Sequence, residues 1–176
     1  MKAVVYEKYG LPEVLQLKEL EKPTPKDNEV LIKTYATTVT ATDCTFRKGE
    51  PKFSRLFTGI TKPKNKTLGS EFAGETEAVG KEVKLFKEGD KVVGTTPGYG
   101  SYSEYICLQA DKSTLAKIPE DKSYEEAIAC CDGFLTALPF LRDKGKIQRG
   151  QNVLIIGASG GVGSAAVQLA NYFGTK

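Results

Sequence analysis

An apolar run that leads directly into a glycine-rich turn constrains the fold of this chain more than any other feature. The run is Val153 to Ile156, and the turn over residues 157–163 reads Gly-Ala-Ser-Gly-Gly-Val-Gly. Residues 164–173 follow with the spacing of an amphipathic helix. A strand, a glycine turn and a helix in this order indicate the start of an α/β domain. We therefore predict a buried strand at Val153–Ile156 and a helix from Ser164 to Phe173.

The turn contains the pattern A-x-G-x-x-G, a variant of the dinucleotide-binding fingerprint with alanine in the first position. In this pattern Gly160 lets the backbone approach a pyrophosphate, Gly163 permits close packing of helix and strand, and the N–H groups at the helix start bind the phosphates. No lysine follows the glycines, which excludes a Walker A loop. The alternative is a glycine-rich turn that binds nothing. The candidate cofactor-binding residues are Ala158, Ser159, Gly160, Gly161, Val162 and Gly163.

The α/β part of the sequence is short. A doubly wound dinucleotide domain has about six strands, and one strand is recognisable before Lys176. We therefore expect residues 151–176 to be the first strand, turn and helix of an incomplete Rossmann domain, and the chain to be part of a longer protein. The residue that selects NAD or NADP follows the glycines by about 20 positions, which lies beyond Lys176.

Short β-rich runs with turn residues between them fill the chain up to about residue 118. Such runs at near-regular spacing predict a small antiparallel barrel or sandwich. Residues 50–66 differ, because they are basic, contain Pro51 and Pro63, and have no clean period; they are interpreted as a long surface loop or a flexible lid. The predicted strands are Ala3–Tyr6, a run opened by Val14, Leu15 and Leu17, Glu29–Thr40, Glu71–Val79, Lys91–Thr95 and Tyr102–Leu108.

A helical segment connects the two parts. Ser123 and Glu126 have the spacing of a capping box, and helical periodicity follows. Gly133 is expected to interrupt it, and Pro139 must occupy a first helical turn or kink the helix. The predicted organisation is a β domain over residues 1–122, a helical connector over 123–150 and the first unit of the dinucleotide-binding domain over 151–176.

The composition excludes several kinds of function. The chain has no histidine among its 176 residues, which excludes His-based triads and every zinc site that needs an imidazole. Its four cysteines form no CxxC pair, and its net charge of +3 is too mild for a nucleic-acid-binding surface. No window approaches the about 18 apolar residues of a membrane span. We expect a cytoplasmic protein with reduced thiols, bound neither to nucleic acid nor to a membrane.

Several segments together resemble the medium-chain dehydrogenase/reductase superfamily. They are LGSEFAGETEAVGKEVKLFKEGDKVVG (68–94), GSYSEYICL (100–108), GFLTAL (133–138) and VLIIGASGGVG (153–163), and the match covers the whole chain. The resemblance implies a mainly β, GroES-like antiparallel barrel, then a helical connector, then the first βα unit of a Rossmann domain. Homodimers are common in the family, and a homodimer is compatible with the resemblance.

The positions of the family's zinc ligands indicate the branch. Thr40 stands where a zinc alcohol dehydrogenase has its catalytic cysteine, and Ser70 stands where it has histidine in a Gly-His-Glu motif. The sequence therefore resembles the zinc-free quinone oxidoreductases. This implies a small carbonyl or quinone substrate and reduction with NADPH, favoured over NAD, without zinc.

The resemblance also implies roles for single residues. Thr136, in a motif like GLTA, is expected to approach the nicotinamide, the alternative being a helical threonine bonded back to a carbonyl. Thr40 is expected to line the same cleft, the alternative being an ordinary strand threonine. Asp43 and Glu71 are interpreted as carboxylates that brace the barrel. Tyr99 and Tyr102 flank a glycine loop, and no residue is selected as the catalytic acid.

Two other functions stay open at this point. One is an alcohol dehydrogenase of the same superfamily, which acts without the usual metal or through unusual ligands. The other is a fragment that binds without catalysing. Reduction of NAD by an alcohol, without activity toward quinones, would favour the first, and a native product no longer than this chain would favour the second.

Overall fold

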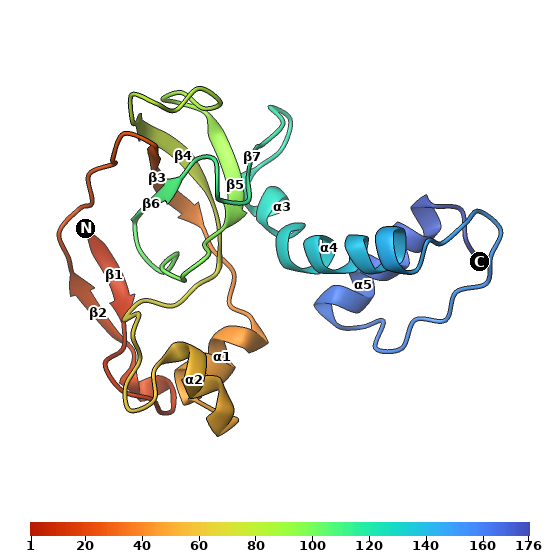
Figure 1. Ribbon diagram of the computed structural model, residues 1–176, viewed down its shortest axis with the longest axis horizontal. Helices are drawn as coiled ribbons and strands as arrows, with labels where there is room; N and C mark the ends of the chain where they lie inside the picture. Colours follow the sequence, from red (N-terminus) through yellow and green to blue (C-terminus); the bar gives the residue numbers. More distant parts are fainter. The chain divides into compact units, whose positions relative to one another are not determined.

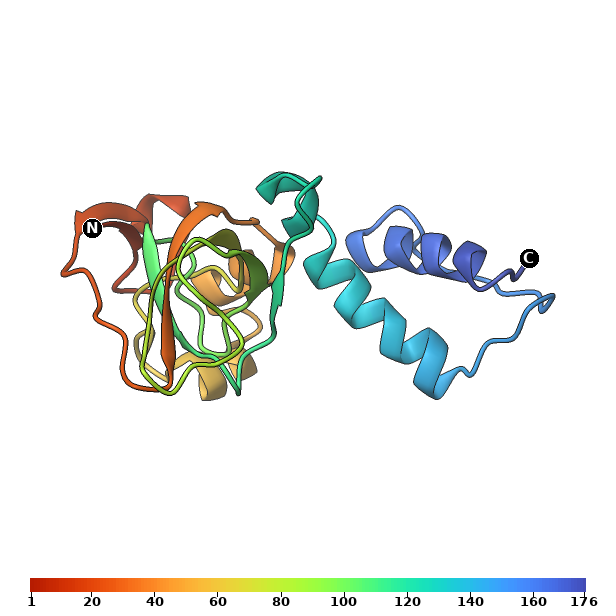
Figure 2. The ribbon, with the colours of Figure 1, turned by 90° about the horizontal axis from the view of Figure 1, so that it is seen from above.

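A computed structural model describes residues 1–176 of the chain, which form two compact units, Met1–Ile128 and Ala129–Lys176 (Figure 1, Figure 2). We refer to them as unit 1 and unit 2 and describe each by itself. Unit 1 contains the sheets, and unit 2 is helical. No helix of either unit is long and apolar enough to cross a membrane.

Unit 1 is built on a five-stranded antiparallel sheet. Its strand order is β6-β3-β4-β5-β7. The long central pair, β3 and β4, has register shifts between Leu31 and Ile32 and between Thr34 and Ala36, which indicate bulges that bend the sheet. The mainly β, antiparallel fold that the sequence predicts is confirmed. The strands are β3 (Glu29–Ala36), β4 (Glu71–Val79), β5 (Lys91–Thr95), β6 (Tyr105–Gln109) and β7 (Leu115–Lys117).

A separate two-stranded sheet lies at the N-terminus of unit 1. It pairs β1 (Lys2–Val5) with β2 (Gln16–Glu19), and a short 3-10 turn, η1 (Pro12–Val14), precedes β2. Isolated bridges join Ala3 to Ser103 and Val5 to Thr67, so β1 also contacts the segments next to β6 and β4. Val14 and Leu15 therefore lie outside the strand that the sequence predicts there, because Pro12 starts a turn instead.

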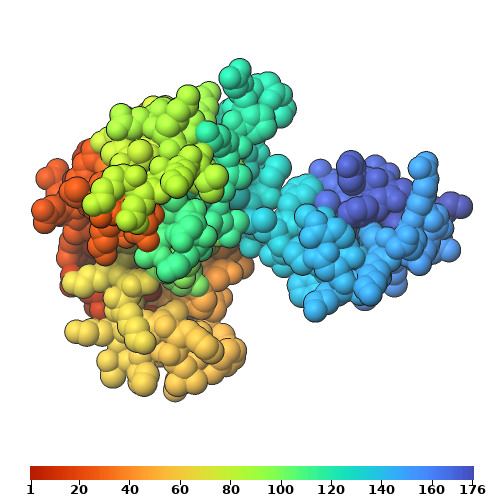
Figure 3. Space-filling view, turned by 45° about the horizontal axis from the view of Figure 1, so that its top comes forward, coloured from red at the N-terminus to blue at the C-terminus, as the bar shows by residue number.

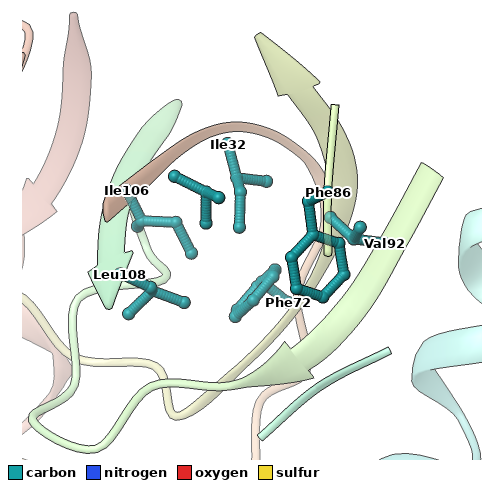
Figure 4. Packing of buried hydrophobic residues seen from close by; sticks show 7 residues of the cluster. Ile32, Phe72, Phe86, Val92, Ile106 and Leu108 are labelled. Carbon is teal, nitrogen blue, oxygen red and sulfur yellow. The ribbon is translucent and has the colours of Figure 1, made fainter. Parts of the chain in front are cut away.

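The main core of unit 1 lies on the concave side of the curved sheet. Ile32, Phe72, Phe86, Val92, Ile106 and Leu108 point toward one another in Figure 4. Ile32, Phe72 and Val92 are completely buried, and they come from the three adjacent central strands. Alternation along these strands places every second side chain in this core, which is the pattern that predicted them.

Residues 41–48 and 52–58 are helical, and the second of these ranges lies where the sequence predicts a loop. Helix α1 spans Ala41–Lys48, a 3-10 turn η2 spans Lys52–Ser54, and helix α2 spans Arg55–Thr58. The prediction of an unstructured loop from residue 50 was wrong for η2 and α2. The prolines lie outside both elements, with Pro51 just before η2, so they do not prevent the helical turns.

Helix α3 (Tyr124–Ile128) begins at the predicted capping box. Glu126 N–H donates to Ser123 Oγ at 3.1 Å, and Ser123 N–H donates to a Glu126 carboxylate oxygen at 2.9 Å. Ile128 is buried with Ile118 and Ala73 of the sheet. The helix therefore packs within unit 1, and the division between the units falls inside the connector predicted for residues 123–150.

Unit 2 contains helices α4 (Cys131–Leu138) and α5 (Gly161–Tyr172), with a π-helical turn η3 (Pro139–Lys144) directly after α4. Gly133 does not interrupt α4, which contradicts the sequence-based expectation. A Cβ atom at Gly133 would lie 2.6 Å from the carbonyl oxygen of Gly161, so glycine lets α4 and α5 approach each other closely. Ala137 packs against Ala165 and Ala166 farther along the same interface.

The predicted strand Val153–Ile156 is not a strand in unit 2. Leu154 and Ile156 are 88% and 89% exposed. A strand needs a hydrogen-bonded neighbour, and only Lys176 reaches this segment, where its N–H donates to Gln151 O and its carbonyl accepts from Val153 N–H. These two bonds have the pattern of a single parallel bridge, which returns the chain beside residues 151–153 after α5.

Candidate functional site

A buried carboxylate at the start of α1 organises the loop between β3 and the helix. Asp43 is 3% exposed. Its Oδ2 accepts hydrogen bonds from Thr40 N–H at 2.9 Å and Thr40 Oγ1 at 2.8 Å, and its Oδ1 accepts one from Gly69 N–H at 3.2 Å. Thr40 Oγ1 in turn accepts from Asp43 N–H, which completes a capping box. Thr40 is thus the N-cap of a helix and not a strand residue.

A second buried carboxylate, Glu71, lies at the start of β4 and is also 3% exposed. One of its carboxylate oxygens accepts a hydrogen bond from Thr38 Oγ1. Thr37 Oγ1 donates to the Glu71 carbonyl at 2.8 Å and lies 2.9 Å from Ser101 Oγ. Asp43 and Glu71 both hold loop residues in place, which agrees with their interpretation as bracing carboxylates.

Three of these hydroxyl residues were not identified from the sequence. Thr37, Thr38 and Ser101 form one polar network with Glu71. A signal for them was present, because Thr-Thr-Val-Thr at 37–40 places three hydroxyls between a strand and a helix start. Nothing in the sequence indicated that Ser101, more than sixty positions later, completes the network.

No other residue type fits at Gly69 in this arrangement. Its φ is +87°, a region that favours glycine, and a Cβ atom there would lie 2.2 Å from Ser101 Oγ. Its N–H donates to Asp43, and its carbonyl accepts from Thr96 Oγ1 at 3.1 Å. Gly69 therefore links Asp43 to the segment that carries Ser101.

The tyrosines around Asp43 stay protonated. Burial, followed by the nearby phenols of Tyr9 and Tyr99 and the charge of Asp43, raises the pKa of Tyr6 to about 12. Burial and then the Asp43 charge raise the pKa of Tyr99 and Tyr102 above the ordinary value. The Tyr102 hydroxyl donates to Thr38 O at 3.1 Å. These phenols can donate hydrogen bonds, but they are poor acids at neutral pH.

An apolar cavity of about 510 Å³ adjoins the polar network in unit 1. Thr37, Ser101 and Tyr102 belong to both the network and the cavity wall. This volume is within the range of small-molecule sites, which combine apolar walls with a few polar groups. The apolar part of the wall includes Ala3, Val4, Leu15, Leu17, Tyr35, Ala36 and Val39.

The glycine turn of unit 2 leaves a helix start open. Helix α5 begins after Gly160, and no side chain caps it. A Cβ atom at Gly163 would lie 2.0 Å from Gly157 O, so the absence of a side chain lets the first turn of α5 lie against the backbone of the glycine turn. A Cβ atom at Gly160 would have its nearest neighbour at 3.5 Å, so space remains over the turn. The first N–H groups of the helix and its dipole are therefore available to an anion.

The predicted site residues fall into both units. Ala158 to Val162 are exposed along the turn, and Gly163 is partly buried in the first turn of α5. Thr136 is half-buried on α4, one turn after Gly133, the residue that contacts Gly161. Unit 2 thus holds Thr136 on the helix that adjoins the glycine turn, and Thr40 belongs to unit 1.

The donor set of the chain does not form a metal centre. No group of three or more Cys, Asp or Glu side chains lies close enough to hold an ion. At the two positions where the resemblance expects zinc ligands, Thr40 has a hydroxyl engaged with Asp43, and Ser70 has another hydroxyl. Neutral hydroxyls are weak ligands for zinc, which prefers thiolate, imidazole and carboxylate.

Comparison with known proteins supports these observations. The chain is 39% identical over 177 residues to the quinone oxidoreductase of Homo sapiens, a match that covers 100% of this chain and 51% of that protein. The structure of Escherichia coli quinone oxidoreductase complexed with NADPH matches with a TM-score of 0.86 and 33% identity, over 100% of this chain and 51% of that one. The CurK enoyl reductase matches with a TM-score of 0.87 and 31% identity, over 99% and 52%.

The chain spans about half the length of the curated relatives it matches. Residues 26–120 match the model of the alcohol dehydrogenase GroES-like domain, which covers more than half of the chain and most of unit 1. The chain therefore belongs to the alcohol dehydrogenase GroES-like family of the medium-chain dehydrogenase/reductase superfamily, in which its relatives include quinone oxidoreductases.

Proposed function

We propose that the protein containing this chain is a zinc-independent, NADPH-dependent oxidoreductase that reduces quinones or enones. The observation that carries the proposal is the open helix start at the glycine turn of unit 2, in a chain of this family. The names of the relatives support it, because they include quinone oxidoreductases, one of them complexed with NADPH, and an enoyl reductase.

The residues of the turn fit a dinucleotide. Gly160 has no Cβ, and no protein atom comes closer than 3.5 Å to where one would be, so a phosphate can approach the backbone. Ala158 to Gly163 would hold the pyrophosphate through N–H groups and the helix dipole. Thr136 and Thr40 are our candidates for the nicotinamide side. When bound, the cofactor supplies a hydride for an electron-poor carbon of the substrate.

The residues of unit 1 suit a reaction that needs no strong electrophile. A quinone or an enone delocalises the negative charge that develops on reduction, whereas oxidation of an alcohol is helped by a metal that lowers the hydroxyl pKa. The hydroxyls of Thr37, Thr38, Thr40 and Tyr102 already donate hydrogen bonds within the protein, so we assign them to holding the wall of the site in place. We assign the apolar cavity beside Thr37, Ser101 and Tyr102 to an uncharged substrate.

The experiment is an assay of the native gene product for oxidation of NADPH with a quinone and with an enone. We expect turnover with both acceptors that is unchanged by a metal chelator. Activity that is lost on chelation and restored by zinc would contradict the zinc-free part of the proposal. Reduction of NAD by an alcohol, with no turnover of quinones, would show an alcohol dehydrogenase instead.

A matched pair of variants tests the turn. Gly160→Val places a side chain where the structure has open space, so we expect an unchanged melting temperature and a loss of NADPH affinity of at least about tenfold. Gly150→Val lies outside the turn and also meets no neighbour, but its φ of +84° adds strain. Asn152→Val, at an exposed residue whose φ is not positive, is therefore the better control, and we expect normal affinity from it. Equal affinity for Gly160→Val and the wild type would overturn the assignment of the turn.

A further inference from the structure

The segment over residues 48–66, which the proposed reductase function does not use, turns its apolar side toward solvent and its polar side toward the protein. Phe53, Leu56 and Phe57 lie on η2 and α2 with the spacing i, i+3, i+4, and Ile60 follows at i+7, just after α2 ends at Thr58. In a soluble protein such a stripe normally faces the core. Here the four side chains are 66%, 67%, 76% and 71% exposed. We call them the apolar stripe.

The polar side of the same segment packs against the protein. Ser54 is 4% exposed. Arg55 Nε donates to Gly49 O at 3.0 Å, and the guanidinium lies 4.6 Å from the centre of the Tyr9 ring. Thr58 Oγ1 lies 2.8 Å from the Tyr9 hydroxyl. These contacts fix the orientation of the two helical turns, so the outward position of the apolar stripe is built into the fold.

Positive charge surrounds the apolar stripe. Residues 48–66 contain six Lys or Arg and one Glu, a net charge of +5, whereas the chain as a whole carries +3 and the remaining residues therefore −2. Arg55 is engaged inside, but the five lysines are exposed. Lys66 forms the one ion pair among them, with Glu7 at 3.9 Å, and the charge of Lys62 also acts on the Glu7 carboxylate. We call Lys48, Lys52, Lys62, Lys64 and Lys66 the lysine rim. Figure 3 shows this part of the chain, in gold, on the surface of unit 1.

A hollow beside the apolar stripe concentrates this charge. A cavity of about 550 Å³ is lined by Lys62, Lys64 and Lys66 together with Ile60 of the stripe. Glu7 also lines it, but the Glu7 carboxylate is already paired with Lys18 at 3.0 Å. The hollow therefore suits a negatively charged group that lies next to apolar material.

We propose that residues 48–66 dock the protein onto the surface of a membrane that contains anionic phospholipids, which revises the expectation of no membrane binding that rested on the lack of a membrane span. The apolar stripe enters the boundary between headgroups and acyl chains, and the lysine rim contacts the headgroup phosphates. The kind of cation favours lipid over a protein partner, because lysine is depleted at protein interfaces, where arginine is enriched, and the one arginine of the segment faces inward. Lysine stems also extend along apolar surface while their charges stay in the headgroup layer.

The test uses the full chain and vesicles of phosphatidylcholine, either alone or with about a third of phosphatidylserine. Because each lysine near such a surface strengthens binding about fivefold, we expect the anionic vesicles to bind the chain at least tenfold more tightly than the neutral ones. High salt should reverse this binding. Absence of binding to the anionic vesicles at low salt would overturn the proposal, and so would equal binding to both kinds.

The chain contains no tryptophan, so one introduced at the apolar stripe is an unambiguous reporter. Phe57→Trp should shift its emission to the blue with anionic vesicles only. Leu85→Trp, at an equally exposed residue outside residues 48–66 (69% exposed), should not shift. No shift for Phe57→Trp, or equal shifts for the two variants, would contradict the proposal.

Paired loss variants separate this surface from general hydrophobicity and charge. Phe57→Ser with Lys62→Gln and Lys64→Gln should reduce vesicle binding by at least about tenfold. Leu85→Ser with Lys84→Gln and Lys87→Gln removes the same kinds of groups elsewhere on unit 1 and should leave it unchanged. All these residues are exposed, so both variants should fold. If the first variant instead abolishes self-association of the chain in the absence of lipid, the surface is an interface between copies and the proposal is wrong.

Discussion

Strand β4 of unit 1 and residues 153–156 of unit 2 were both predicted to be strands, and they have opposite surroundings. β4 spans Glu71–Val79, as predicted to the residue, and it pairs with β3 on one side and β5 on the other. Residues 153–156 are all apolar, which is more than β4 can show, yet they form no strand, and Leu154 and Ile156 are almost fully exposed. Apolar content alone therefore does not make a segment a buried strand, because a strand forms only where neighbouring strands provide partners.

The largest expected difference between the two segments is in hydrogen exchange. The amides of β4 are bonded within a core sheet, so their exchange should be slowed by about a thousandfold or more, as a global free energy of unfolding of about 5 kcal/mol implies. The amides of Leu154, Ile155 and Ile156 should exchange close to the rate of an unfolded chain. Exchange followed by mass spectrometry of peptides measures both, and comparable protection would mean that residues 153–156 have partners in solution.

The next difference concerns stability. Phe72→Ala in β4 empties a completely buried site and should reduce the free energy of unfolding of unit 1 by about 3–5 kcal/mol. Ile156→Ala removes an exposed side chain and should change stability by about 0.5 kcal/mol or less. Urea titrations followed by circular dichroism compare the two. A cost for Ile156→Ala close to that for Phe72→Ala would show that Ile156 is covered.

The glycine turn extends the comparison, because its backbone packs closely against the start of α5 although the segment before it has no partner strand. Gly163→Ala would bring a Cβ atom to 2.0 Å from Gly157 O, and it should cost about 1–3 kcal/mol. Gly160→Ala meets nothing closer than 3.5 Å and should be nearly neutral. Thermal unfolding of the two variants measures the difference. Equal costs would mean that the turn adopts another conformation.

The smallest effect is expected at the edge of the β4 sheet, where an ion pair supports β5 and β7. Burial works to raise the pKa of Asp90, but hydrogen bonds from Lys117 Nζ at 2.8 Å and Lys87 N–H at 2.9 Å outweigh it and lower that pKa below its usual value. Because the pKa of Asp90 is lower in the folded than in the unfolded state, its charge stabilises the fold above the unfolded pKa of about 4. This stabilisation is lost as the pH falls through the folded-state pKa.

Asp90→Asn should therefore melt below the wild type at neutral pH, and the gap should close on acidification below pH about 4. Lys112→Met removes an exposed lysine near β7 without an ion pair, and it should melt like the wild type throughout. Melting curves over a pH series measure the gap. A constant gap would show that the amide disturbs packing and that the charge has no part in it.

The sequence predicted most of what depends on local pattern. β-rich runs between turn residues located β4 and β5 to the residue, and Ser123 with Glu126 located the start of α3. Gly163 was predicted to permit close packing of helix on strand, whereas its close contact is with the backbone of the turn at Gly157. Sequence patterns were less informative where tertiary contacts determine the secondary structure. β7 has only three residues, which are too few to show a period. Gly133 lies within α4, where its lack of a side chain lets the backbone of Gly161 approach the helix.

The candidate site was predicted in part for the same reason. The glycine turn is contiguous in sequence, so its geometry follows from local rules. The network of Thr37, Glu71 and Ser101 joins three distant segments, and no local signal connects them. The apolar stripe was missed because residues 50–66 as a whole show no clean period. The contacts of Arg55 with Gly49 and Tyr9, which turn the stripe outward, leave no mark in a local pattern.

The capping box at Thr40 has a consequence for how such a chain can evolve. A cysteine at position 40, the first step toward a metal-binding relative, would remove the hydroxyl that caps α1, at a cost of about 1 kcal/mol. It would also take one hydrogen bond from the buried Asp43 carboxylate, which would still hold Gly69 N–H. The first substitution is thus harmful until a second ligand is present. The N-cap of α1 therefore stabilises threonine at position 40 against replacement by a single cysteine.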